Sequence, residues 1–250
     1  MNKAKRLDVL LVENKYCESR NKANFLIKNG YVCVDGICIL DVSKKININE
    51  KIEININKDE LRISRGFTKL EKAIEFFNID LKNHICVDIG SSTGGFTECL
   101  LKNEAKKIYA IDCGKDQLHN TLKENKNVIS LESTNFIKIE KTLIVDKVDF
   151  ISCDVSFISS EKIINKIIDL GWKNFESVFL FKPQFEAGKK IISKTKGYVD
   201  EKFHNSLIEN FLSFLMEKKF RDIKYIDSPI SGKKMNNKEY LFYMKMDNDE

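Results

Sequence analysis

The pattern of apolar and polar positions divides the chain into a short first part and a longer second part. Apolar residues recur every three or four positions in two early stretches, Leu7, Leu10 and Leu11, then Ala23, Leu26 and Ile27. This spacing predicts two amphipathic helices, the second beginning after the N-cap residue Ser19. Asp35-Gly36 lies between two apolar runs and predicts a hairpin, and residues 52–56 alternate like a strand with one wet face. Residues 1–57 are therefore predicted to form a small α/β module.

The second part alternates between strand and helix signals. Strands are predicted at 85–89, 107–112, 128–132, 148–154, 177–181, 222–226 and 240–246. Helical spacing is clearest at 70–77, 163–168 and 203–215. This alternation predicts an α/β fold with a doubly wound, mostly parallel, Rossmann-like sheet over residues 64–250. The polar stretch 58–63 has no core pattern and is predicted to be the linker.

A glycine-bearing turn follows the first predicted strand of the second part. Its spacing is G-x-x-x-G-G from Gly90, whereas a dinucleotide fingerprint requires G-x-G-x-x-G. Asp88 would repel a pyrophosphate but can accept hydrogen bonds from an amino-bearing ligand such as S-adenosylmethionine. Asp112 ends the next strand, where a carboxylate can bind ribose hydroxyls. The candidate cofactor-binding residues are Asp88, Gly90, Ser91, Ser92, Gly94, Gly95, Phe96, Asp112 and, near the adenine, Asn135.

Four further polar residues stand beside predicted strands or helices. Lys69 begins the leading helix, Asp154 and Lys182 follow apolar strands, and Glu239 precedes an aromatic strand. A single charged residue in such a place is usually only solvated. Ligands in doubly wound sheets bind beyond the carboxyl ends of the strands, so four such residues predict a catalytic site there.

Composition limits the remaining possibilities. The net charge of +5 permits a nucleic-acid partner without requiring one. No apolar run approaches the roughly 20 residues of a membrane-spanning helix, so no membrane insertion is expected. Seven cysteines without a C-x-x-C pair predict reduced thiols in a cytoplasmic protein, and Cys33 and Cys38 flank a tight turn. Three scattered histidines show no ligand spacing, so no metal is expected.

The first part resembles the S4 domain, an RNA-binding module. The resemblance rests on Arg6-Leu7-Asp8, Ser19-Arg20 and the run from Gly30 to Gly36, and it covers most of residues 5 to 57. In that family the helices present basic side chains to structured RNA. The resemblance makes Arg6, Arg20 and Lys22 candidate RNA contacts.

The second part resembles the 2′-O-ribose methyltransferases of the FtsJ type, which use a Lys-Asp-Lys-Glu tetrad. The whole chain is similar to the TlyA family, also called haemolysin A, through the segments 64–66, 88–97, 154–158, 182–186 and 237–240. Members of that family methylate cytidine ribose in ribosomal RNA of the large subunit and, in some cases, the small subunit. The resemblance implies S-adenosylmethionine as cofactor, ribosomal RNA as partner, and Lys69, Asp154, Lys182 and Glu239 as the tetrad. Arg65 is a further candidate RNA contact.

These residue types suit the reaction. Methylation of a hydroxyl is an in-line displacement that needs positioning and a base. Lys182, buried among phenylalanines and near Lys69, is predicted to lose its proton and act as that base. Asp154 would orient the amine and the ribose, and Glu239 would hold Lys69 or the hydroxyl.

Three other interpretations remain open from the residues. A nicotinamide-dependent oxidoreductase could use the same sheet, although the glycine spacing and Asp88 disfavour it. A membrane-damaging protein is disfavoured because residues 203–215 are better explained as a helix covering the sheet. An RNA-binding protein that has lost catalysis is disfavoured by the intact set of four polar residues.

Overall fold

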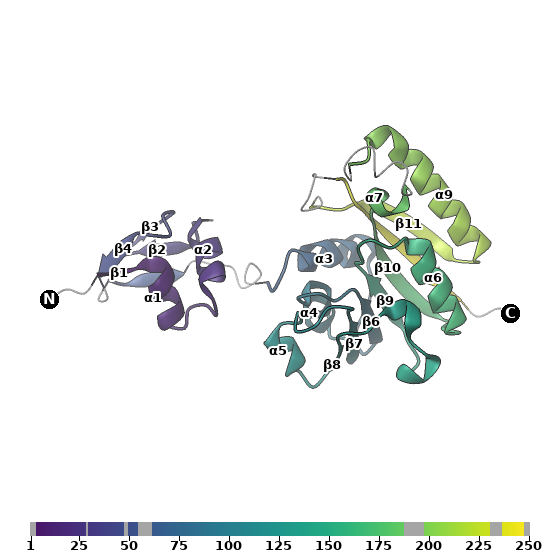
Figure 1. Cartoon of the computed structure of the whole chain (residues 1–250), viewed down its shortest axis with the longest axis horizontal. Coiled ribbons are helices and arrows are strands. Elements are labelled where there is room, and N and C mark those ends of the chain that lie inside the picture. The colour runs from purple at the N-terminus through teal and green to yellow at the C-terminus, as the bar shows by residue number, and fades with distance from the viewer. Residues whose placement is uncertain are drawn as a thin grey trace. The chain divides into compact units, whose positions relative to one another are not determined.

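The computed structural model describes residues 4–28, 30–47, 50–54, 62–187, 198–230 and 237–247. The chain folds as two compact units, Met1–Leu61 and Arg62–Glu250 (Figure 1). The predicted linker at 58–63 falls mostly outside the described residues, so its exact limits stay a prediction.

The first unit contains both predicted helices and the predicted hairpin. Its elements are β1 (Ala4–Arg6), α1 (Leu7–Glu13), α2 (Arg20–Lys28), β2 (Val32–Val34), β3 (Ile37–Cys38), β4 (Lys45–Asn47) and β5 (Ile52–Ile54). The Ser19 hydroxyl accepts a hydrogen bond from the Lys22 backbone at 3.3 Å, which confirms the N-cap. Asp35 and Gly36 have positive φ angles of 47° and 80°, as a two-residue hairpin requires. The apolar faces of α1 and α2 pack on β2 to form the core.

The prediction of reduced cysteines is wrong for one pair. Cys33 and Cys38 are joined by a disulfide, with their Cα atoms 3.8 Å apart. The reason is the hairpin register, which places these two residues directly opposite each other on β2 and β3. Among the described residues, the other five cysteines have free thiols.

The second unit is built around a seven-stranded sheet. Its strands, in spatial order, are β11 (Arg221–Asp227), β12 (Tyr240–Met246), β10 (Phe175–Phe181), β9 (Phe150–Cys153), β6 (Ile85–Ile89), β7 (Lys107–Ile111) and β8 (Val128–Leu131). The five strands from β10 to β8 run parallel, and β12 pairs antiparallel with both of its neighbours. The predicted mostly parallel, doubly wound sheet is confirmed.

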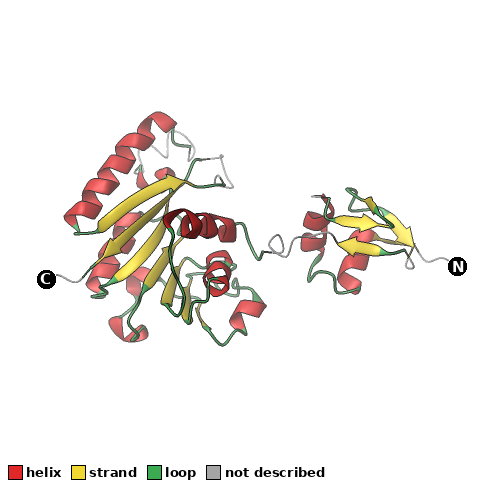
Figure 2. Cartoon of the chain, turned by 180° about the vertical axis from the view of Figure 1, so that it is seen from behind, coloured by secondary structure: helices red, strands yellow, loops and turns green. Residues whose placement is uncertain are grey.

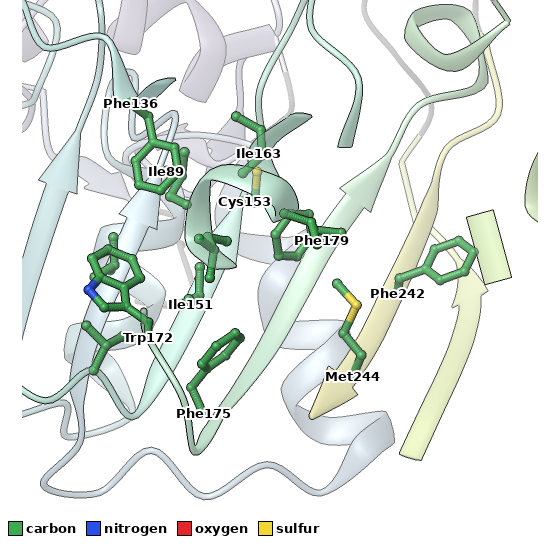
Figure 3. Close-up of a cluster of buried hydrophobic side chains, with 14 of the residues drawn as sticks. Ile89, Phe136, Ile151, Cys153, Ile163, Trp172, Phe175, Phe179, Phe242 and Met244 are labelled. Carbon is green, nitrogen blue, oxygen red and sulfur yellow. The ribbon is translucent and has the colours of Figure 1, made fainter. Parts of the chain in front are cut away.

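Helices cover both faces of this sheet (Figure 2). They are α3 (Gly66–Phe77), α4 (Gly95–Lys102), α5 (Asn120–Lys123), α6 (Ser160–Asp169), α7 (Pro183–Glu186) and α9 (His204–Glu217). Short 3-10 helices lie at Phe136–Lys138, Lys141–Leu143 and Glu201–Phe203. One core joins the sheet to α3, α4 and α5, and the other joins it to α6 and α9. Figure 3 shows the second core, in which Ile151, Phe179 and Ile163 pack together. Burial on both faces explains why the central strands are almost continuously apolar.

Candidate active site

The first pair of tetrad residues joins a helix to a strand. Lys69 of α3 donates a hydrogen bond to Glu239, with 2.6 Å between Nζ and Oε2. The two side chains are 9% and 4% exposed, so this ion pair is almost fully removed from water. A buried ion pair of this kind requires both partners, because removing one leaves an uncompensated charge.

The second pair lies at the ends of two adjacent parallel strands. Lys182 follows β10 and its Nζ lies 2.5 Å from Asp154, which follows β9. The same amino group also donates to the Val155 carbonyl at 3.0 Å and to the Ser156 hydroxyl at 3.5 Å. The Lys182 side chain is 9% exposed, whereas that of Asp154 is 25% exposed. Asp154 is therefore the more exposed member of this pair.

Strand direction brings the two pairs to one edge of the sheet. Phe181 is opposite Tyr240 in the antiparallel register, so Lys182 and Glu239 lie at the same end of neighbouring strands. Glu239 precedes its strand, but β12 runs in the opposite direction to β10. The structure thus brings Lys69, Asp154, Lys182 and Glu239 together at the carboxyl edge of the parallel strands.

The glycine turn packs directly against this edge. Gly90 has a φ of 84°, and a Cβ there would lie 2.5 Å from the Asp154 carbonyl oxygen. At Gly95, a Cβ would collide with Ser64 and with the backbone of Gly66 and Phe67. Glycine is therefore required where the turn meets Asp154 and where it meets the start of α3.

Asp88 lies beneath the turn rather than on its surface. Its side chain is completely buried, and its two oxygens accept hydrogen bonds from Thr97 at 2.6 Å and Ser152 at 2.9 Å. Burial raises the pKa of Asp88 to about 7, against the opposing effect of these two hydroxyls. In this position Asp88 joins β6 to α4 and β9. Its predicted contact with the methionine end of a cofactor stays a prediction.

Asp112 keeps its carboxylate at the surface of the turn. Its oxygens accept backbone hydrogen bonds from Ser92 at 2.8 Å and Gly114 at 2.7 Å, and each oxygen retains a lone pair for another donor. Ser91 is 4% exposed, and its hydroxyl oxygen has no partner among the described residues. Buried polar atoms without a partner are unusual, so Ser91 has a free group to offer a ligand.

The other candidate cofactor residues have more varied surroundings. Phe96 is 3% exposed and packs in the core with α3, and Gly94 is the left-handed N-cap of α4. Asn135 caps the 3-10 helix Phe136–Lys138 by accepting a hydrogen bond from the Ile137 backbone. Their side chains or backbone thus have evident structural roles in shaping the turn and its neighbouring loop.

Comparisons with known families agree with this geometry. The family model of the FtsJ-like methyltransferase matches residues 62–246, and the model of the S4 domain matches residues 5–52. The chain belongs to the FtsJ-like methyltransferases. The resemblance inferred from the sequence is confirmed for both domains.

Several relatives of this FtsJ-like methyltransferase match it over nearly their whole length. Hemolysin A of Brachyspira hyodysenteriae is 41% identical, over 94% of this chain and 98% of that relative. The 23S rRNA (cytidine-2′-O)-methyltransferase TlyA of Campylobacter jejuni is 34% identical, over 91% and 94%. A solved structure from Streptococcus thermophilus that carries the name hemolysin is 32% identical with a TM-score of 0.73, over 100% and 90%.

Sequence reasoning missed one residue beside the active site of this FtsJ-like methyltransferase. Phe157 is 90% exposed and has a φ of 65°, a backbone conformation that bulky residues rarely adopt. Its ring lies 5.2 Å from that of Phe185, and the Lys182 amino group lies 5.8 Å from the Phe185 ring. An exposed aromatic residue held under strain at an active site points to binding. The sequence signal was an aromatic residue within three positions of Asp154.

The candidate RNA contacts lie in both units. Arg65 is exposed and precedes α3. Lys22 lies over the ring of Phe25 at 5.5 Å, and Arg6 and Arg20 are exposed and bind Asp8. Their contact with RNA stays a prediction.

Neither a membrane span nor a metal site was found in the described parts of this FtsJ-like methyltransferase. Among those residues, no helix combines the length and apolar character needed to cross a bilayer. The same residues contain no cluster of three or more His, Cys, Asp or Glu side chains that could hold a metal ion.

Proposed function

We propose that this chain transfers the methyl group of S-adenosylmethionine to the 2′-hydroxyl of a cytidine in ribosomal RNA. The substrate would be the large subunit and, as in some relatives, also the small subunit. The observation that carries this proposal is the meeting of two Lys–carboxylate pairs beside the glycine turn. The 34% identity to a named cytidine-2′-O-methyltransferase over nearly its whole length supports the choice of nucleotide.

The residues at the turn fit the cofactor. Bound S-adenosylmethionine would supply an electrophilic methyl group on a positively charged sulfur. Asp112 has lone pairs free for ribose hydroxyls, and the buried Ser91 hydroxyl oxygen lacks a partner among the described residues. Gly90 keeps the backbone of the turn close to Asp154, so the cofactor site and the tetrad are neighbours.

Within this proposal, Lys182 takes the proton of the 2′-hydroxyl. Before the transfer, its neutral amine has two N–H bonds and one lone pair, so the 2′-hydroxyl takes the place of one of the three acceptors, Asp154, the Val155 carbonyl and Ser156, while the other two keep their hydrogen bonds. They therefore stabilise the charge that forms on Lys182 as the proton arrives, which favours the transition state. Asp154 is exposed enough to contact the ribose as well. Glu239 neutralises Lys69 and holds it in place.

Basic residues of both units would hold the RNA. Arg6, Arg20 and Lys22 lie on the first unit and Arg65 lies at the start of the second. Contacts of this type bind phosphates and position the RNA, and they carry little sequence information. The exposed Phe157 ring offers a stacking surface for a base beside Lys182.

Mapping of ribose methylation tests the proposal directly. Ribosomal RNA from cells with and without the gene would be compared for 2′-O-methylated positions, with complementation by the wild type and by Lys182→Ala. We expect a cytidine to lose its methyl group in the deletion strain and to regain it only with the wild type. Unchanged ribose methylation, or loss of a methyl group from a base instead, would reject the proposal.

A further inference from the structure

A buried carboxylate lies between two of the candidate RNA-binding arginines of the first unit. Asp8 is in α1 between the core residues Leu7 and Leu10, and its side chain is completely buried. Arg6 donates to it from Nε at 2.9 Å and from Nη2 at 3.1 Å. Arg20, the first residue of α2, donates to Oδ2 from Nε at 3.2 Å and from Nη2 at 2.7 Å.

The exposure of these side chains is unequal. The carboxylate is buried, but the side chains of Arg6 and Arg20 are 43% and 59% exposed. Hydrogen bonds from Arg6, followed by those from Arg20, lower the pKa of Asp8 to about 2 although burial opposes them. Asp8 is therefore ionised at any physiological pH, and the three residues together retain a positive charge that faces solvent.

The Asp8 carboxylate fixes the positions of both guanidinium groups. Each group uses its Nε edge on Asp8. The N–H donors on its other side have no partner among the described residues and can reach an anion. Two arginines this close would repel each other without the carboxylate between them. An ordered guanidinium group also loses less conformational entropy when it binds a phosphate.

We propose that Arg6, Asp8 and Arg20 form one phosphate clamp for RNA, in which Asp8 is the positioning residue. This inference rests on the proposed function, because the phosphate would belong to ribosomal RNA. An acidic residue on a basic RNA-binding surface should weaken binding by simple repulsion, whereas Asp8 strengthens it by holding two arginines in place.

The test compares two substitutions that remove the same charge. Asp8→Asn breaks the clamp, since the amide NH₂ faces guanidinium donors. Asp41→Asn is the matched control, because Asp41 is exposed, acts on Arg6 only through its charge, and can keep its bonds to Ser43 as an amide. Binding of the full-length protein to a large-subunit rRNA transcript would be measured over a range of salt concentrations.

We expect Asp8→Asn to weaken RNA binding roughly tenfold and to flatten its salt dependence, as loss of ordered phosphate contacts predicts. The loss should appear as a raised KM for RNA, whereas S-adenosylmethionine affinity should not change. Asp41→Asn should bind RNA as tightly as the wild type or slightly tighter. Equal or tighter binding by Asp8→Asn, with a wild-type salt slope, would overturn the clamp.

A second variant covers the case in which Asp8→Asn does not fold. Arg20→Lys keeps the charge but cannot donate from a planar fork, so it should also weaken binding and reduce the salt slope. Wild-type binding by Arg20→Lys would then reject the clamp. If the wild type shows no preference for ribosomal RNA, the proposed function fails. The binding of the wild type and the variants to poly(U) still tests the clamp in that case. Equal binding by the wild type and the variants would reject the clamp, and so would a failure of the wild type to bind poly(U).

Discussion

The glycine motif predicts that Asp88 contacts the cofactor, whereas the structure buries its carboxyl group. The structure buries this carboxyl completely and raises its pKa to about 7, chiefly through burial. Between pH 3.8 and about 7, the unfolded chain has released this proton while the folded protein keeps it. The free energy of unfolding therefore falls as pH rises through this range, and the loss is complete above pH 7.

The size of the effect follows from the two pKa values. The difference between the ordinary value of 3.8 and about 7 corresponds to about 4 kcal/mol of destabilisation above pH 7. An asparagine amide in place of this carboxyl could not ionise, but it would bond less well to Thr97 and Ser152, at a cost of about 1 to 2 kcal/mol. We expect Asp88→Asn to stabilise the second unit by about 2 to 3 kcal/mol at pH 8 and to give no gain at pH 4.

Urea unfolding at pH 4 and pH 8, followed by a signal from the second unit, measures this difference. Asp80→Asn is the control, because it removes an exposed carboxylate whose oxygen caps a turn at Lys82. A loss of stability at pH 8 for Asp88→Asn would show that the buried carboxyl does not destabilise the folded protein at that pH.

Calorimetry of the same variant tests the cofactor contact, since a buried Asp88 predicts nearly unchanged S-adenosylmethionine affinity. A loss greater than tenfold in a folded variant would show the direct contact that the sequence motif predicts.

Three more predictions concern the active site. Lys182→Arg should be almost inactive while still binding cofactor and RNA, because guanidinium cannot accept a proton; near wild-type turnover in a methylation assay would leave Lys182 as a charge only. Phe157→Gly should raise the free energy of unfolding by about 1 kcal/mol, because glycine relieves the strain of the positive φ, and it should weaken binding of the RNA substrate. A KM for RNA equal to that of the wild type would exclude stacking on Phe157. Gly90→Ala should lower the free energy of unfolding by at least about 2 kcal/mol and abolish S-adenosylmethionine binding, because its Cβ would strike the Asp154 carbonyl. Thermal unfolding measures the first effect and calorimetry the second, and wild-type values in both would contradict the prediction.

Most secondary-structure elements of the chain, and the location of the site at one edge of the sheet, followed from the sequence. Apolar periodicity reports which face of a segment is buried, so α1, α2 and the seven strands of the large sheet could be predicted. The strands β1 and β4 were missed, because three residues are too few to show a period. Carboxyl ends of parallel strands share one edge, so Asp154 and Lys182 were expected to be neighbours before the structure was known. The Asp35-Gly36 turn was equally predictable, because few residue pairs tolerate two positive φ angles.

The pairing and burial of the polar groups, in contrast, depend on how distant elements pack together. Lys69 and Glu239 are 170 residues apart in sequence, and they meet because β12 runs antiparallel to β10. Asp88 is buried because Thr97 and Ser152 close over it from two other elements. Local periodicity describes a residue's own segment, whereas these contacts depend on which segments pack together across the fold. The pairing of distant elements, and with it the protonation of buried groups, is therefore a property of the whole fold.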